Sequence, residues 1–523
     1  MSHRWKMLVA VVVALLVLTG VVMINMHYQP QSEVEVYKRS LLAKGEKLEI
    51  SQVLPPAVPP GSNGADVVRA AFALLVSDDD DYGYFTNLPP AMHMIAPGRA
   101  MVGWAQPDVR GYYTSYYTNT WENVKAAAET NRPGTELLRR VMDYPTIDFQ
   151  PDYGDWPAMP LEHLSPLRRC ALKLLIAAMC NLHQGNAASA ITNLCTMLAL
   201  VQGTHDERTI LSQHTRKSVG STATAGTWEL LRSTNVTDAE LALLQRSWEQ
   251  TEFIYAAEKT FLVERACLET TIQKMRASGA DFSRIAGIFG LVSRSGSGAS
   301  GNWLEEFKRA WRGAKRGGAK FMWRTSWSYS DELQALQGDQ VVLESIRRIE
   351  TNQIFNPGYT NMLNQLQTLG ITNDPDAWFL KQYKRFFRQH FSDDVVISSH
   401  VVAWTMAAEA SRRIDVTAIA LKRYQLRHGD YPADLTALVP EFVPSVPRDP
   451  VDGHPLRYRR NTDGTFLLYS VGENGKDDGG DPLPGKGVKT SFFNWLNPDA
   501  LDWVWPQPAT PEEVQNYYAH PPE

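Results

Sequence analysis

Four side chains near the C-terminus place hard oxygen atoms within eight residues: Asn474, Asp477, Asp478 and Asp481. Glycines stand among them, at positions 472, 475, 479 and 480, and let the backbone curl so that carbonyl groups turn inward. Calcium takes six to eight oxygen ligands in loose geometry, and carbonyls near Ser470 would complete such a shell. Taken alone, this pattern favours a solvated acidic turn, with a calcium site as the alternative.

Histidine and carboxylate side chains in the middle of the chain form no motif typical of a metal or nucleophile site. A zinc protease places two histidines one helical turn apart beside a glutamate. Here His205 and His214 are nine residues apart and would leave a helix on opposite faces. The sequence therefore favours a non-catalytic protein. The alternative is a cell-envelope hydrolase whose site is assembled by folding, with a pocket lined by His205, Glu207 or His214.

A helix and a hairpin must position the acidic residues. Val395 to His428 has the apolar spacing of one long helix, and Gly429 ends it. Leu456 to Arg460 and Thr465 to Val471 are typical of strands, and the four residues of 461–464 form the turn between them. We therefore expect a long helix laid against a small antiparallel sheet. The aromatic tail that ends at Trp505 is expected to pack over the hairpin.

Three stretches of this region share their order and spacing with a known family. They read ALKRYQLRHGDYPADLTALVP at 420–440, VPRDPVDGHPLRYR at 446–459 and FLLYSVGENGKDDGGD at 466–481. This text resembles the soluble domain of the major pseudopilin of type II secretion, in which a helix ends in a Gly-x-Tyr-Pro turn and a glycine-rich acidic loop binds calcium. The resemblance implies a pseudopilin-like α+β domain over 395–523, a relation to type II secretion, and calcium ligation by Asn474, Asp477, Asp478 and Asp481.

The chain departs from the pseudopilin pattern in its first part. A pseudopilin anchor helix contains a glutamate and runs straight into the sheet domain. In this chain the apolar N-terminal segment has no acid, and a long region separates it from residue 395. The C-terminal region is therefore interpreted as a borrowed domain rather than as a filament subunit.

The N-terminal segment predicts a transmembrane anchor. Met7 to Ile24 contains eighteen residues without a charge, close to the roughly 20 that span a bilayer. Arg4 and Lys6 precede it, so the positive-inside rule places the N-terminus in the cytoplasm and the bulk outside. A cleaved signal peptide and a buried core helix are the alternatives. The expected protein is a single-pass, periplasm-facing protein of a bacterial inner membrane, with residues 1–27 as tip and anchor.

The region between anchor and C-terminal domain is expected to be mostly helical. Residues 28–63 read as a tether with a rigid proline run, and 64–391 as the helical region. Ser165 and Pro166 are typical of a helix start, and a second apolar helix over 187–201 completes a helix hairpin. Further helices are predicted at 207–232, 238–277, 331–354 and 376–391. The fold class is therefore mainly α, with one transmembrane helix and a C-terminal α+β domain.

Charge gives little evidence about partners outside one segment. The net charge of -5 provides no general attraction to nucleic acid, so none is expected as a partner. Asn302 to Trp327 interleaves basic and aromatic residues and is interpreted first as a solvated helix face beside core aromatics. The alternative for this segment is contact with an anionic membrane surface.

The four cysteines form no Cys-x-x-Cys pair and are expected to be small buried side chains. A disulfide between Cys180 and Cys195 is the alternative. Taken together, the sequence favours a membrane-anchored structural or interaction protein outside the cytoplasm, with a calcium-stabilised C-terminal domain. The protein partner is not identified by any motif.

Overall fold

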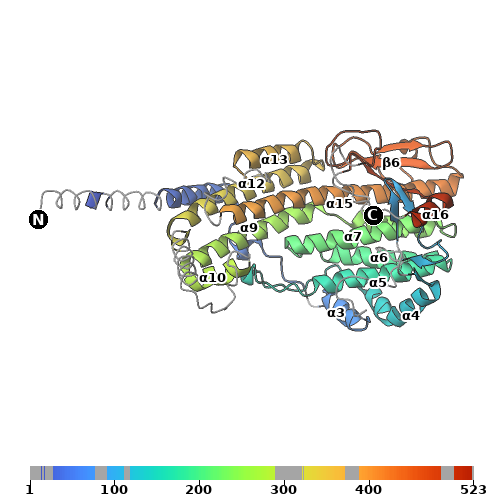
Figure 1. Ribbon diagram of the computed structural model, residues 1–523, viewed down its shortest axis with the longest axis horizontal. Helices are drawn as coiled ribbons and strands as arrows, with labels where there is room; N and C mark the ends of the chain where they lie inside the picture. The colour runs from blue at the N-terminus through green and yellow to red at the C-terminus, as the bar shows by residue number, and fades with distance from the viewer. Residues whose placement is uncertain are drawn as a thin grey trace, which may run out of the picture.

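The computed structural model describes residues 13–14, 17, 28–59, 61–76, 91–110, 118–288, 321, 323–371, 388–483 and 500–520. These residues are mainly helical, and their short strands form small sheets. Most of the long helices run along the length of an elongated molecule (Figure 1). The helix over residues 28–43 lies at one end of this body, and the strands gather toward the other.

Three apolar helices form the centre of the helical region: α5 (Leu164–His183), α6 (Ala187–Gly203) and α7 (Ile210–Leu230). N-caps define the starts of α6 and α7. The side chain of Asn186 accepts a hydrogen bond from the backbone N–H of Ser189, and that of Thr209 accepts one from the backbone N–H of Ser212. A side chain at Gly226 would collide with Leu194, so this glycine lets α6 and α7 approach closely. The helix pair predicted from Ser165 onward is present as α5 and α6.

Further helices surround this centre. On the α5 side lie α3 (Ala65–Ala73) and α4 (Trp121–Leu138), and on the other side lie α8 (Asp238–Gln250) and α9 (Ile254–Ala277). The remaining described helices are α2 (Ile50–Val53), α10 (Gly279–Ile288), α12 (Ser328–Asn352), α13 (Gly358–Thr368), α15 (Arg388–His428) and α16 (Pro511–Ala519). Short 3-10 turns cover Arg139–Asp143, Tyr153–Asp155 and Leu435–Leu438, and a π turn covers Trp323–Trp327.

Helix α15, of 41 residues, joins the C-terminal sheet to the helical region. It packs against α7, α8, α9 and α12, and its C-terminal half also contacts the sheet (Figure 1). That sheet has the order β5–β6–β7, with β5 at Arg457–Arg460, β6 at Phe466–Ser470 and β7 at Trp503–Val504, all antiparallel. Trp503 and Trp505 are fully buried, so the described end of the aromatic tail packs on the hairpin as expected.

A second small sheet joins segments far apart in the sequence. It has the order β1–β2–β8, with β1 at His93–Ala96, β2 at Arg99–Met101 and β8 at Gln507–Pro508. Strand β8 lies parallel to β2. A third pair consists of β3 (Val109–Arg110) and β4 (Thr118–Asn119). Neither sheet was expected, because residues 82–117 show no clear periodicity.

One continuous hydrophobic core runs through the described residues from Ala65 to Trp505. It includes the apolar faces of α5, α6, α7 and α15 and the inner face of the β5–β6–β7 hairpin. The predicted helical region and the predicted C-terminal domain therefore share this core. All four cysteines are free, with Cys170, Cys180 and Cys267 buried inside it or beside it and Cys195 half-buried.

The prediction of a transmembrane helix requires correction. Within the part of the chain that the structure describes, no helix is both long enough and apolar enough to cross a membrane. The most apolar helix, α6, has only 17 residues and packs between α5 and α7. Longer helices carry charged side chains such as Arg265 of α9 and Asp415 of α15 into the interior. The predicted inner-membrane and periplasmic location is withdrawn with the helix.

Two predicted membrane segments lie mostly outside the described residues. Of Met7 to Ile24, only residues 13, 14 and 17 are described. Of Asn302 to Trp327, residue 321 and the turn Trp323–Trp327 are described. In that turn Trp323 is fully buried and its Nε1 donates to Asp331 Oδ2 at 2.8 Å, so this aromatic belongs to the core.

Candidate functional site

The acidic loop that follows β6 holds the four residues predicted to bind calcium. Asn474, Asp477 and Asp478 are exposed, and Asp481 is half-buried. The structure brings one pair together, because Asn474 Nδ2 donates to Asp478 Oδ2 at 2.8 Å. Asp481 Oδ1 instead accepts from the backbone N–H of Leu483 at 2.9 Å. The four side chains therefore do not converge on one point.

Asp477 is held by neighbours on the sheet. Its Oδ1 accepts from the Tyr469 hydroxyl at 2.8 Å and from the N–H of Gly479 at 3.0 Å, and its Oδ2 lies 3.3 Å from Arg457 Nε. The hydrogen bond from Tyr469 and the nearby guanidinium hold the pKa of Asp477 below its usual range. This carboxylate therefore has protein partners already.

A buried carboxylate fills the inner side of the loop. Asp502 is completely buried and accepts from three backbone N–H groups, those of Asp478 at 3.4 Å, Gly480 at 2.8 Å and Asp481 at 3.1 Å. Burial raises its pKa above the ordinary value, although these donors oppose that shift. The loop thus turns N–H groups inward at these positions, where the calcium prediction expected carbonyls.

A second buried aspartate anchors the start of the hairpin. Asp449 accepts from the N–H groups of Val451 and Val471, both at 2.9 Å, and from the Ser470 hydroxyl at 2.8 Å. Its Oδ2 also pairs with Arg457 at 3.1 Å. The local sequence predicted neither Asp449 nor Asp502, because Asp449 reaches Ser470 and Val471, and Asp502 reaches residues 478–481, all some twenty positions away.

No group of three or more His, Cys, Asp or Glu side chains among the described residues is placed to hold a metal ion. Calcium at Asn474, Asp477, Asp478 and Asp481 therefore stays a prediction. Its ligands would have to exchange their present hydrogen bonds for a metal ion.

The three residues of the hydrolase alternative separate into different surroundings. His205 Nε2 lies 3.1 Å from Asp206, and its Nδ1 lies 2.7 Å from the carbonyl of Gln202. Glu207 is buried and pairs with His163, whose ring stacks on Phe149. His214 is exposed on α7, where its ring meets Trp404 of α15 edge-on. The connection before α7 thus holds His205 and Glu207, and the α7–α15 contact holds His214.

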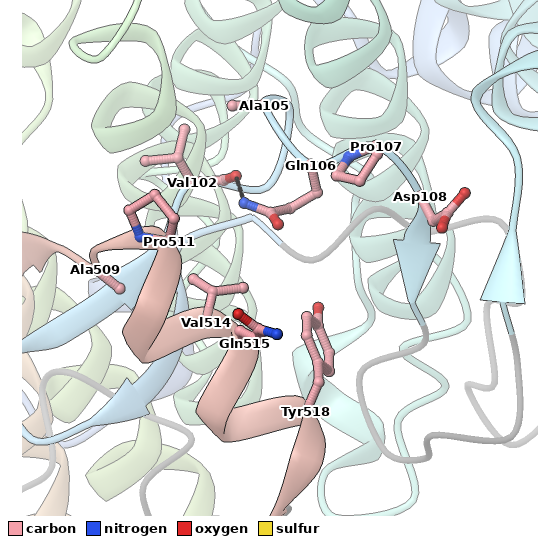
Figure 2. A pocket seen from close by; sticks show the side chains of 10 residues that line it. All are labelled: Val102, Ala105, Gln106, Pro107, Asp108, Ala509, Pro511, Val514, Gln515 and Tyr518. Carbon is pink, nitrogen blue, oxygen red and sulfur yellow. Dashed lines mark hydrogen bonds between the residues drawn. The ribbon is translucent and has the colours of Figure 1, made fainter.

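An open cavity lined by both apolar and polar side chains lies beside α16. Its volume is about 570 Å³. Figure 2 shows Pro511, Val514, Gln515 and Tyr518 of α16 on one side and the segment after β2 on the other. We call this site the α16 cleft, and it is lined by Val102, Ala105, Gln106, Pro107, Asp108, Ala509, Pro511, Val514, Gln515 and Tyr518.

The spacing of the α16 residues explains their common face. Residues 514, 515 and 518 follow Pro511 by three, four and seven positions, and this spacing places all four side chains along one side of the helix. A capping box starts this helix, because Thr510 and Glu513 each bond to the other's backbone N–H. Pro511 occupies its first turn, where the missing N–H has no cost. The short helix is therefore well defined by its own sequence.

Strand β8 carries α16 to the cleft. The N–H of Gln507 donates to the carbonyl of Gly98, and the N–H of Ala509 donates to the carbonyl of Ala100. Arg99 adds an ion pair to Glu513 at 3.1 Å, and Tyr518 donates its hydroxyl to the sulfur of Met101 at 3.2 Å. These contacts hold the α16 wall of the cleft to strand β2 and the residue before it.

The opposite wall depends on one buried carboxylate of α7. Glu229 has no exposed surface, and it accepts from the N–H of Met92 at 2.7 Å and from the N–H of Gly103 at 2.9 Å. Trp104 Nε1 donates to the backbone carbonyl of the same glutamate at 3.0 Å. Burial raises the pKa of Glu229 to about 7, against the effect of these donors. This side chain ties both ends of the β1–β2 hairpin to the helical core.

The lining of the α16 cleft combines apolar and polar side chains. Val102, Ala509 and Val514 offer apolar surface, while Gln106 and Gln515 offer amides. Among the described residues of the lining, Asp108 alone carries a formal charge. The volume falls within the roughly 300–1,000 Å³ typical of ligand sites. The sequence contained no signal for this site, because its two walls lie about 400 positions apart.

Comparison with known proteins adds no relative to this picture: no family model matches the chain, and neither a curated protein nor a solved structure matches it.

Proposed function

We propose that this chain is an interaction protein that binds an extended segment of another polypeptide in the α16 cleft. The observation that carries this proposal is the preformed cleft itself, whose walls are fixed by backbone hydrogen bonds and by the buried Glu229. A site that is ordered before binding loses less conformational entropy when its ligand arrives.

The side chains of the lining favour a polypeptide over other ligand classes. Amides such as Gln106 and Gln515 both donate and accept, which matches the alternating N–H and C=O groups of an extended backbone. The apolar floor at Val102 and Val514 suits apolar side chains of such a segment. No lysine or arginine is among the described residues that line the cleft, so these residues offer no counter-charge to a phosphate or a nucleic acid.

The resemblance of residues 420–481 to a pseudopilin supports the same class of function, because pseudopilins act through protein contacts. On this basis we also propose that the C-terminal unit is related to type II secretion components. The shared core means that this unit is presented by the helical scaffold rather than by a flexible linker.

The test uses the full chain and a random library of twelve-residue peptides displayed on phage. Enriched peptides are then synthesised with a fluorophore, and their dissociation constants are measured by fluorescence anisotropy. The test variant is Gln515→Arg, which fills the cleft from an exposed position of α16. The matched control is Asn516→Arg, one residue further on the same helix, exposed and outside the lining.

Peptides bound by the native chain should bind the Asn516→Arg variant equally and the Gln515→Arg variant about tenfold or more weakly, since a loss of about 1.4 kcal/mol is tenfold. Equal binding by both variants would show that the peptides bind elsewhere. A library that yields no binder would count against the polypeptide class.

A further inference from the structure

Lys217 lies where α7 meets α15, and none of the described residues gives it a carboxylate partner. Lys217 is half-buried on α7, and it lines a small cavity of about 20 Å³, enough for about one water. Phe253, Val401 and Trp404 supply much of the apolar wall. The exposed His214 also lines this cavity, so it lies near the protein surface.

Few contacts replace the water molecules that the Lys217 ammonium group loses on burial. Its nearest described partner is the ring of Trp404, with Nζ at 5.6 Å from the ring centroid. No ion pair or hydrogen bond reaches it from any described residue. Burial lowers the pKa of Lys217 to about 8.

Lys38 shows the contrast within the same chain. Its ammonium group is also buried, but it is paired with the carboxylates of Glu269 and Glu332. Burial alone would lower the pKa of Lys38, and the two carboxylates raise it above the ordinary value. Both lysines are half-buried, and the difference between them is that described carboxylates pair with Lys38 and none of the described carboxylates pairs with Lys217.

The groups that face Lys217 come from three parts of the fold. Helix α7 contributes Gln213 and His214, the second of them one turn before the lysine. Phe253 and Ala257 lie at the start of α9, and α15 adds Val401, Trp404, Thr405 and Ala408. No carboxylate is among them. Burial, then the charges of Lys217 and Arg168, lower the pKa of His214, so its imidazole is neutral at pH 7.

We propose that Lys217 is a nucleophilic amine that binds small aldehydes or ketones covalently as an imine. A lysine desolvated in an apolar pocket is a recognised form of activated nucleophile. The Nζ lone pair attacks the carbonyl carbon, and a proton moves from nitrogen to oxygen to give a carbinolamine. The carbon–oxygen bond then breaks, and water leaves as the carbon–nitrogen double bond forms. The departing hydroxyl takes a proton from solvent at the surface end of the cavity, and the iminium nitrogen then releases its proton to solvent, so that the imine and water result.

The size of the cavity limits the ligand. A space of about 20 Å³ holds the carbonyl end alone, so the rest of the molecule must lie toward the surface beside His214 and Trp404. The class is therefore a small, uncharged carbonyl compound with a short or flat substituent. This site is separate from the α16 cleft and does not depend on the function proposed for that cleft.

The test treats the full chain with acetaldehyde and sodium cyanoborohydride, which traps an imine as an ethylated amine, and maps each lysine by mass spectrometry. At pH 7 about a tenth of an amine with a pKa near 8 is neutral, against roughly 0.04 % of an ordinary lysine. We expect Lys217 to be labelled at least about tenfold faster than the exposed Lys125. Its labelling rate should level off above pH 8.

Two variants of Thr405 provide the matched comparison. Thr405→Asp places a carboxylate in the cavity wall, should restore the lysine charge, and should slow labelling of Lys217 about tenfold at pH 7. Thr405→Asn has nearly the same shape and should leave labelling unchanged. Labelling of Lys217 at the rate of Lys125, or equal labelling in the two variants, would overturn the proposal.

Discussion

Glutamate 229 should make the stability of this protein depend on pH. Its carboxyl group has no exposed surface, and its pKa rises from 4.5 to about 7. Between these two values the folded chain holds a proton that the unfolded chain has lost. Stability from this group is therefore complete below pH 4.5 and is lost as the pH rises through 7.

The size of this effect follows from the shift. A shift of one pKa unit corresponds to 1.36 kcal/mol, so the change from 4.5 to about 7 corresponds to about 3 kcal/mol. The substitution Glu229→Gln removes the titration while keeping an oxygen that accepts from Met92 and Gly103. The variant should therefore lack this loss and be more stable than the native chain at pH 8.

The assay is urea unfolding at pH 4.5, 6 and 8, with hydrogen exchange of the segment around Gly103 as a local measure. The control is Glu162→Gln, which removes an exposed carboxyl group. We expect the free energy of unfolding of the control to follow the native chain at every pH. If the Glu229→Gln variant keeps the full pH dependence of the native chain, the burial argument for this carboxyl group is wrong.

Three further predictions concern other buried or acidic groups. Asp502→Ala leaves three N–H donors of the acidic loop without their acceptor and should cost about 1–3 kcal/mol, measured as a lower urea midpoint with faster hydrogen exchange at Gly480 and Asp481. Calcium at a hundred times its dissociation constant should stabilise the native chain by about 2.7 kcal/mol and raise its Tm. The double variant Asp477→Ala, Asp478→Ala should show no rise in Tm. If calcium does not raise the Tm of the native chain, the calcium prediction is wrong. Glu46→Ala leaves the buried Arg265 without its partner carboxylate and should lower the free energy of unfolding by about 3–5 kcal/mol. The variant should unfold at a lower urea concentration and be cleaved by proteases before α2. Unchanged resistance to urea and protease would mean that the other contacts of residues 28–48 are sufficient to hold this segment.

Local sequence signals predicted the elements that are defined by neighbours in the chain. The helix pair from α5 onward, the helix that ends at Gly429 and the hairpin between β5 and β6 each depend on turns or periodicity within a few residues. These features depend on local backbone geometry, so they can be recognised from the amino-acid sequence. Ser165 does not cap α5, because His163 holds the N-cap position and makes no capping hydrogen bond with its side chain.

The α16 cleft was not predictable in the same way. Its walls meet through the parallel pairing of β2 with β8, which no spacing rule encodes. Glu229 would have looked like an ordinary helical residue, because its role is to accept from backbone groups more than 120 positions away. The acidic loop was predicted to turn its backbone carbonyl groups inward. In the structure Asp502 accepts hydrogen bonds from three backbone N–H groups of this loop, so N–H groups rather than carbonyls point inward at these positions.

The pairing of β2 with β8 also has a consequence for the order of events during synthesis. Arg99 and Pro508 are 409 positions apart, so the ribosome must complete nearly all of the described scaffold before this contact can form. During that interval β2 has only β1 as a neighbour, and its other edge stays open. The α16 cleft can therefore form only after the late segment arrives, and until then the free edge of β2 is open to pairing with other strands.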